Sequence, residues 1–486
     1  MGPMTVRATF ALLCFLLMPI GAQALVYPEL TAPNARFYPL YDHTVHAQAL
    51  VEAIDTAEPG DHIDFLYYLI TADRRIGLPV IEALRRAANR EVHVRVLTSD
   101  IANIYMDRSG WDIQLLTDKS LATPIQFTKF GGWRNWFHGL GFNDALHEKL
   151  VLIRGPAGVK VAFFGGRNLD HNETFLDLAF IVKPLNVTSS SLCDQLWQVF
   201  EDRWDTVQRL FQPLRLRRTA PRTAQIAAES HTSLSPKQVR EIPSPEQVQD
   251  MDGVRRFMAS AGVDAEPVPG ELRPAAAQVI TNEMLGNART GIFSRTLLGR
   301  ARMPDDIEFK AEEILLSEKM IYLMSMIASF SPRLMGALKI AMQDALLRIY
   351  SNGRKAARLV VPRGVSYMVS LSAFIDLFKT PYPRGNLEVR LMAPDARYNF
   401  MHLKGIYTPR LALLLTSNLN SQSVANNTEM AIVVNDPVFA QAMLEDITRR
   451  VEPLFHELDC ETALSDYETE STLFRRVLNF FVSMFY

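Results

Sequence analysis

Cysteine is scarce in this sequence, and neither sign of charge is in excess. The three cysteines among 486 residues are too few for a disulfide scaffold, and no cysteine and histidine cluster has the spacing of a zinc site. The net charge of −2 argues against nucleic-acid binding through bulk positive charge. Apolar residues make up 48% and charged residues 21%, which excludes a disordered, collagen-like or coiled-coil chain.

The apolar run at residues 8–20 is too short for a membrane span, which takes about 20 residues. It follows Arg7 and precedes an Ala-Gln-Ala sequence at residues 22–24, which has the form of a cleavage site. We therefore expect residues 1–24 to be a signal peptide and the mature chain to be periplasmic or secreted, or peripheral on a membrane. An uncleaved N-terminal anchor is the alternative.

The chain contains an internal repeat of strand and helix patterns. In the first copy we expect a strand, a helix and a strand at residues 62–68, 78–89 and 92–97. In the second copy we expect the same elements at residues 320–326, 335–350 and 358–361. Alternating strands and helices predict an α/β fold in which helices cover a sheet.

The segment between the copies, residues 211–274, is rich in proline, arginine, serine and alanine, which predicts a linker or insertion. We expect a first domain at residues 25–210, a second at 275–460, and an amphipathic C-terminal tail at 461–486 that lies on a membrane or docks on the protein. Each domain contains one cysteine, Cys193 or Cys460. In an oxidising compartment these two either pair or remain buried thiols.

The most informative pattern is a His-x-Lys pair in each copy, formed by His147 and Lys149 and by His402 and Lys404. Residues two apart in a strand point to one face, so each pair presents both side chains together. For this composition about 0.25 such pairs are expected by chance. Each pair also precedes a hairpin and a second strand that ends at an asparagine. These asparagines are Asn168 and Asn418.

This duplicated pattern resembles the phospholipase D superfamily, whose signature is a repeated His-x-Lys with a downstream Gly-Ser-x-Asn-like turn. The run Gly165-Gly166-Arg167-Asn168 matches that turn well. The run Leu415-Thr416-Ser417-Asn418 matches it loosely, with Thr416 at the usual serine position. The segment before the first histidine also resembles bacterial cardiolipin synthases of the same superfamily. The sequence departs from the family at Arg154 and Pro409, which stand where the signature continues with an aspartate.

The resemblance implies two pseudo-symmetric phospholipase D-like domains, each a mixed β-sheet flanked by helices, with the active site at their interface. Because one chain holds both half-sites, we expect a monomer. The family aspartate lies at a turn away from the reacting phosphate, so its loss mainly threatens the folding of the hairpins.

The resemblance also implies the chemistry of phosphodiester cleavage. A histidine can attack phosphorus, and a second can protonate the leaving alcohol near neutral pH. We assign His147 as the nucleophile that forms a phosphohistidine and His402 as the acid and base, although the near-symmetry of the copies leaves this order open. The lysines and asparagines then donate to the non-bridging oxygens, and this chemistry requires no metal or cofactor.

A nucleophilic histidine needs an orienting partner. Asp177 and Glu429 follow the motif asparagines at the start of the next apolar strand. In the family, a carboxylate at this place hydrogen-bonds a catalytic histidine and fixes its tautomer. The alternative is a solvated acid at the end of a strand.

The segment that leads into His147 combines aromatic and basic residues: Phe127, Lys129, Phe130, Trp133, Arg134, Trp136, Phe137, Leu140 and Phe142. Such a segment suits a bilayer interface, or else it forms a lobe that buries its own aromatics. With export and near-zero net charge, it favours a phospholipid substrate and a membrane surface over nucleic acid. The alternatives are a nuclease or other phosphodiesterase on the same scaffold, and a catalytically silent membrane-binding homologue.

Overall fold

The computed structural model describes residues 33–71, 76–99, 111–131, 145–170, 175–185, 191–211, 251–260, 267–282, 306–357, 365–381, 386–394, 398–420, 423 and 427–471. Several sequence predictions lie outside these ranges. They are the signal peptide at 1–24, the strand at 358–361, most of the aromatic segment before His147 (Trp133, Arg134, Trp136, Phe137, Leu140 and Phe142), and the end of the C-terminal tail.

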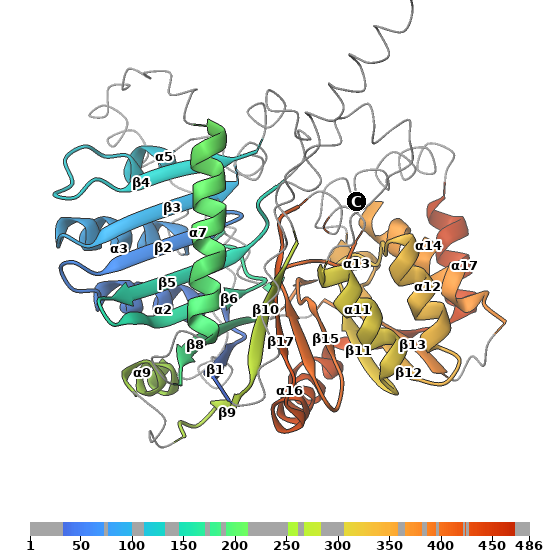
Figure 1. The fold of residues 1–486 in the computed structure, drawn as a ribbon. Coiled ribbons are helices and arrows are strands. Elements are labelled where there is room, and N and C mark those ends of the chain that lie inside the picture. The colour runs from blue at the N-terminus through green and yellow to red at the C-terminus, as the bar shows by residue number, and fades with distance from the viewer. Residues whose placement is uncertain are drawn as a thin grey trace, which may run out of the picture.

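Two mixed β-sheets form the body of the molecule (Figure 1). The strands of the first, in spatial order, are β4 (Gln126–Phe130), β3 (His93–Ser99), β2 (His62–Tyr67), β5 (Lys149–Gly155), β6 (Gly158–Gly165), β8 (Ala179–Pro184), β1 (Ala35–Leu40) and β9 (Leu272–Ala275). Those of the second are β18 (Phe455–Leu458), β13 (Leu387–Met392), β12 (Leu346–Asn352), β11 (Met320–Met324), β15 (Gly405–Tyr407), β16 (Ala412–Leu415), β17 (Met430–Val434) and β10 (Ala277–Thr281).

The two sheets repeat one topology. The order β4-β3-β2-β5-β6-β8-β1 in the first sheet corresponds strand for strand to β13-β12-β11-β15-β16-β17-β10 in the second. In each, the first three strands run parallel and the others pair antiparallel. The prediction of two pseudo-symmetric α/β domains is therefore confirmed.

Helices cover both sheets and also fill the space between them. The outer face of the first sheet packs on α2 (His43–Asp55), α3 (Gly77–Asn89), α5 (Trp111–Leu116) and α9 (Met251–Ala259). The outer face of the second packs on α11 (Asp306–Ser317), α12 (Pro332–Ala341), α14 (Val365–Phe378) and α17 (Cys460–Glu470). One core is common to both sheets and includes α7 (Leu192–Phe211) and α16 (Pro437–Arg450). This shared core holds the two halves together around the site.

The helix expected at 335–350 is wrong in its second part. Helix α12 ends at Ala341, and Leu346–Asn352 forms strand β12 beside β11. The side chain of Asn386 caps the end of the helix by donating to the carbonyl of Met342, at 3.0 Å. A short apolar run does not distinguish a buried strand from a buried helix by its periodicity.

Part of the expected linker is folded. Strand β9 pairs with β1, and the Phe257 ring of α9 packs 5.4 Å from that of Tyr38. The thiols of Cys193 and Cys460 are both free, and that of Cys193 is buried. Among the described residues, no helix is long and apolar enough to cross a lipid bilayer.

Candidate active site

Each His-x-Lys pair lies where the chain enters a central strand of its sheet. Lys149 begins β5, and Lys404 immediately precedes β15. The backbone just before each strand pairs with the other half of the molecule. The amide of His147 donates to the carbonyl of Thr428 at 3.0 Å, and that of His402 donates to the carbonyl of Leu176 at 2.7 Å.

These backbone hydrogen bonds belong to short parallel β-pairings between the two halves. Strand β7 (Phe175–Leu176) of the first half pairs with β14 (Phe400–Met401) of the second. A matching isolated bridge joins Leu146 to Thr428. Each histidine is thereby placed beside a segment of the opposite half that leads directly into a carboxylate.

The carboxylates contact the histidines of the opposite half. His147 Nδ1 lies 3.1 Å from Glu429 Oε2, and His402 Nδ1 lies 2.5 Å from Asp177 Oδ2. Because an ionised carboxylate only accepts hydrogen bonds, each Nδ1 carries the proton and each Nε2 has a free lone pair. Both neutral imidazoles are therefore oriented to react through Nε2.

Burial sets the charge of the two imidazoles, which are each 7% exposed. It lowers the pKa of His147 to about 4 against the opposing effect of Glu429. Burial and the charge of Lys404 lower the pKa of His402 to about 3, and Lys149 adds to this effect from the other half. Both pKa values lie below 7, so the two histidines are neutral at pH 7.

The two carboxylates remain ionised despite their burial. Burial raises the pKa of Asp177, but His402 and Lys404 outweigh it and leave that pKa well below the usual range. His147 outweighs the same effect of burial at Glu429, whose pKa is also lowered. The site therefore retains the charged form that orients each ring.

The two lysines form a buried cationic pair behind the histidines. Lys149 Nζ donates to the carbonyl of His147 at 2.5 Å, and Lys404 Nζ donates to that of His402 at 2.7 Å. Burial and the charge of Lys404 lower the pKa of Lys149 to about 7, and burial lowers that of Lys404 to about 8. Two ammonium groups that are poor in hydrogen-bond partners suit a bound phosphate.

Each asparagine turn is held by a hydrogen bond to its backbone carbonyl. The carbonyl of Asn168 is 2.9 Å from His43 Nε2, and that of Asn418 accepts from Ser325 Oγ at 2.6 Å. The Oδ1 atoms of both asparagines are buried and have no hydrogen-bond partner in the part of the chain that the structure describes. The backbone of each turn is thus fixed within its own half.

Close packing around the first turn favours glycine at residues 165 and 166. A Cβ on Gly166 would lie 2.8 Å from Asp177 Oδ1 and 3.3 Å from Lys404 Nζ. A Cβ on Gly165 would lie 2.6 Å from the carbonyl of Leu178. Lys404 of the second half therefore lies close to the Gly166 turn of the first.

In the second turn, Thr416 supports a carboxylate. Its Oγ1 donates to Glu429 Oε2 at 2.6 Å and accepts from the amide of Met430 at 3.0 Å. The structure describes all eleven residues that the sequence analysis selected for the site, and hydrogen bonds link each histidine to its lysine and to its carboxylate. The eleven residues are His147, Lys149, Gly165, Gly166, Asn168, Asp177, His402, Lys404, Thr416, Asn418 and Glu429.

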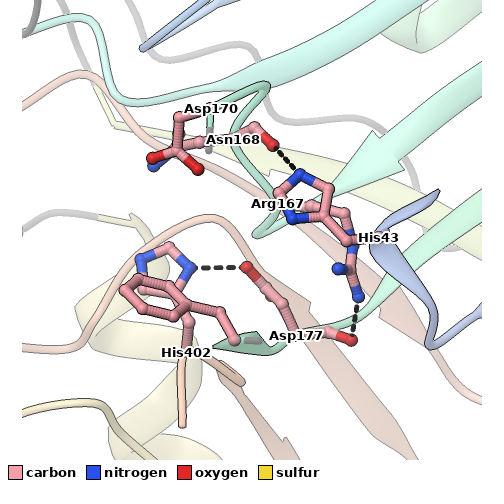
Figure 2. A pocket seen from close by; sticks show the side chains of 7 residues that line it. His43, Arg167, Asn168, Asp170, Asp177 and His402 are labelled. Carbon is pink, nitrogen blue, oxygen red and sulfur yellow. Dashed lines mark hydrogen bonds and ion pairs between the residues drawn. The ribbon is translucent and has the colours of Figure 1, made fainter. Parts of the chain in front are cut away.

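A small cavity opens beside His402 (Figure 2). It is lined by His43, Arg167, Asn168, Asp170, Phe175, Asp177 and His402. The sequence analysis assigned no role to His43, Arg167, Asp170 or Phe175. It also missed Tyr68, whose ring packs edge-on against His147 at 4.7 Å. His43 and Tyr68 belong to distant segments with no motif of their own.

The two departures from the family signature have local replacements. Arg154 Nε donates to the buried Asp64 of the adjacent strand at 2.7 Å. This ion pair links β5 to β2. At the second hairpin, Thr408 Oγ1 accepts from the amides of Arg410 and Leu411 at 3.2 and 3.1 Å. Both hairpins are therefore held without the family aspartate, on the side away from the histidines.

Within the described residues, no three side chains of histidine, cysteine, aspartate or glutamate are grouped to hold a metal ion.

Known proteins share this sequence pattern and this fold. Residues 50–204 match the family model described as cardiolipin synthase, PLD-like domain. The crystal structure of phosphatidylserine synthase from Haemophilus influenzae Rd KW20 superposes with a TM-score of 0.58 and 16% identity, over 94% of this chain and 97% of that chain. No curated protein sequence matches the chain.

Two further solved structures are less similar. Polyphosphate kinase from Porphyromonas gingivalis has a TM-score of 0.45 and 12% identity, over 91% of this chain and 53% of that chain. Nuc from Salmonella typhimurium, a phospholipase D family member, has a TM-score of 0.25 and 18% identity, over 37% of this chain and 97% of that chain. The predicted resemblance to the phospholipase D superfamily is thus confirmed by the family model for residues 50–204, and the whole chain has the fold of the phosphatidylserine synthase.

Proposed function

We propose that the protein is an exported phosphodiesterase that acts on phospholipids through a phosphohistidine, by hydrolysis or by phosphatidyl transfer to an alcohol. One observation carries this proposal: two neutral imidazoles, each oriented by a carboxylate of the opposite half, flank two buried lysines. This set provides a nucleophile, a proton carrier and an oxyanion site for one phosphate.

The reaction has two displacements. Nε2 of His147 attacks phosphorus, the bond to the leaving alkoxide breaks, and His402 gives that alkoxide a proton. His402 then takes a proton from water or an acceptor alcohol, whose oxygen attacks phosphorus and breaks the N–P bond. The negative charge of the bound phosphodiester offsets the lysine charges and raises the pKa of His402, so this histidine gains its proton as substrate binds.

The surroundings of the cavity favour a lipid over nucleic acid. Phe175 and Asp170 line it together with a single arginine, Arg167. A nuclease needs a row of cations along the phosphates of its substrate. We further propose that the protein works as a monomer, because one chain supplies both half-sites. Its place of action would be the membrane surface that contains a phospholipid substrate.

The test is to incubate the purified chain with labelled phosphatidylglycerol and phosphatidylethanolamine, with and without glycerol, and separately with DNA. Phosphatidic acid indicates hydrolysis. Phosphatidylglycerol made from phosphatidylethanolamine and glycerol, or cardiolipin made from phosphatidylglycerol, indicates transfer. We expect lipid turnover in the wild type and His456→Gln, an exposed histidine of β18, and none in His147→Gln or His402→Gln. Turnover of DNA alone would favour the nuclease, and binding of lipid without turnover would favour a silent homologue.

Export depends on residues 1–24 and has its own test. N-terminal sequencing of the protein from a cell fractionation is expected to find a chain that begins near Leu25 in the periplasm or the medium. A full-length chain in the membrane fraction would instead favour the uncleaved anchor.

A further inference from the structure

A buried ion pair lies directly behind the His147 half of the site. Glu148, between His147 and Lys149, is 0% exposed. Its carboxylate accepts from Arg203 Nε at 2.8 Å and from Thr428 Oγ1 at 2.7 Å. Arg203 belongs to α7 of the first half and Thr428 to the second half. Glu148 therefore connects the two halves.

Arg203 continues the network to the segment that carries Glu429. Its Nη2 donates to the carbonyl of Asn282, at the end of β10, at 2.9 Å. The side chain of Asn282 donates to the carbonyl of Asn427 at 2.6 Å and accepts from the amide of Glu429 at 2.5 Å. Residues 427–429 are therefore held through Thr428 on one side and Asn282 on the other.

The second half is built differently at the matched position. Leu403 takes the place of Glu148 and is 1% exposed. There the carboxylate of Asp177 accepts from the amide of the next residue, Leu178, at 2.8 Å. The ion pair thus belongs to one histidine of a nearly symmetric pair.

Stability alone does not explain such a pair. Removing two charges from water costs about as much as their attraction returns, and apolar residues of similar size often stabilise a protein as well. Leu403 occupies the equivalent place in the second half without an ion pair. What the ion pair adds is direction, because each hydrogen bond fixes one point of the backbone that ends at Glu429.

We propose that Glu148 and Arg203 are positioning residues that keep Glu429 in register with Nδ1 of His147. They act through Thr428 and Asn282 and touch neither the phosphate nor the imidazole. This inference rests on the proposed function, in which His147 reacts through the opposite nitrogen. A shift of Glu429 would release the ring and populate the tautomer whose Nε2 carries the proton.

The test replaces both charges together, because a single substitution would strand a buried ion. The variant Glu148→Leu with Arg203→Met gives the first half the residue type of the second. The matched control is Arg36→Met with Glu271→Leu, which removes another buried ion pair of the first half. In that pair Arg36 Nε lies 2.6 Å from Glu271 Oε1, and each side chain is 3% exposed. A second test variant, Thr428→Val, leaves the ion pair intact and cuts only its hydrogen bond to the Glu429 segment.

Two measurements are made on each protein. The first is the ¹⁵N spectrum of histidine side chains, with the His147 signal assigned by its absence in His147→Gln. The second is kcat and KM on phospholipid vesicles. We expect the charge-pair variant and Thr428→Val to lose the uniform Nδ1–H tautomer of His147. Their kcat should fall about 10- to 100-fold, with KM nearly unchanged. This fall is the one known for the loss of groups that orient a metal-binding histidine.

The control variant, Arg36→Met with Glu271→Leu, should alter thermal stability but leave both the tautomer of His147 and kcat unchanged. If both test variants keep the tautomer and the kcat of the control, the positioning role is wrong. A wild type that turns over no lipid would overturn the proposed function instead. The spectrum would still decide the role of Glu148 and Arg203, because it needs no substrate.

Discussion

Nδ1 of His402 lies 2.5 Å from Oδ2 of Asp177, although 225 positions separate the two residues. The equivalent contact of His147 with Glu429 spans 282 positions in the opposite sense. Each half of the molecule thus supplies the carboxylate that orients the histidine of the other half. A half-site alone would have a histidine of undefined tautomer.

Replacing either carboxylate by its amide is expected to lower kcat by about 10³- to 10⁴-fold, because an amide can donate to Nδ1 and stabilise the unreactive tautomer. The variants are Asp177→Asn and Glu429→Gln, and Glu457→Gln, an exposed position in β18, is the control. Rates on labelled phospholipid measure the effect. A loss below tenfold in both variants would contradict the orienting role.

Affinity for a phosphodiester should decrease as pH rises through 7 to 8. The pKa of Lys149 is about 7 and that of Lys404 about 8, so both lose the charge that binds phosphate in this window. Calorimetry with a phosphonate monoester, an analogue of the phosphodiester whose single negative charge is constant over this range, should give a Kd at least about tenfold higher at pH 9 than at pH 6. Lys149→Arg should flatten this dependence, because a guanidinium stays charged. Equal affinities of the wild type at both pH values would refute the account.

Lys149→Met is expected to abolish turnover but stabilise the fold. The lysine pKa is about 7 in the folded chain and near 10.5 when unfolded, so the unfolded state binds more protons between these values. The lysine therefore costs stability most at pH 7 and below, and this cost disappears as pH approaches 10.5. Thermal unfolding at pH 6.5 and pH 9.5 should show a larger gain in Tm at the lower pH. Lys319→Met, at a residue whose side chain is 70% exposed, is the control and should show no gain. A Tm of Lys149→Met at or below that of the wild type would contradict this prediction.

Restoring the family aspartate should harm this protein. Arg154→Asp would place a carboxylate beside Asp64, which is 0% exposed, whereas Arg154→Ala leaves Asp64 its second partner, Arg95, at 2.7 Å. We expect Arg154→Ala to lose about 1–3 kcal/mol of unfolding free energy and Arg154→Asp to lose more. Denaturant unfolding measures both, and the kcat of the folded fraction should be unchanged. A more stable Arg154→Asp would show that Arg154 does not replace the family residue.

The two His-x-Lys pairs could be found in the sequence because their pattern is local. His-x-Lys followed by a hairpin and an asparagine is readable within one strand pair, and its recurrence at His402 marked the duplication. The sequence did not predict that each carboxylate orients the histidine of the opposite half. That arrangement depends on two-residue strands such as β7 and β14, which pair across the halves. A two-residue strand has no periodicity to detect.

Other parts of the site depend on tertiary structure in the same way. His43 reaches Asn168 from the first turn of α2, and Tyr68 packs on His147 from the end of β2. Neither residue has a neighbour in sequence that marks it. The expected helix at 335–350 failed for a related reason, since the sheet recruits Leu346–Asn352 as β12 where local pattern allows a helix.

The central claim is that the two histidines act on one phosphorus, and a trapped intermediate tests it most directly. Phospholipid labelled at phosphorus is mixed with each protein, quenched with alkali and mapped by peptide mass. An acid-labile adduct should form on His147 in the wild type and be absent from His147→Gln. In His402→Gln it should form more slowly, because the acid for the leaving alkoxide is missing, and then persist, because the base for its breakdown is missing too. An adduct on His402 would reverse the two roles. Turnover with no histidine adduct, or with both histidines replaced, would contradict the account.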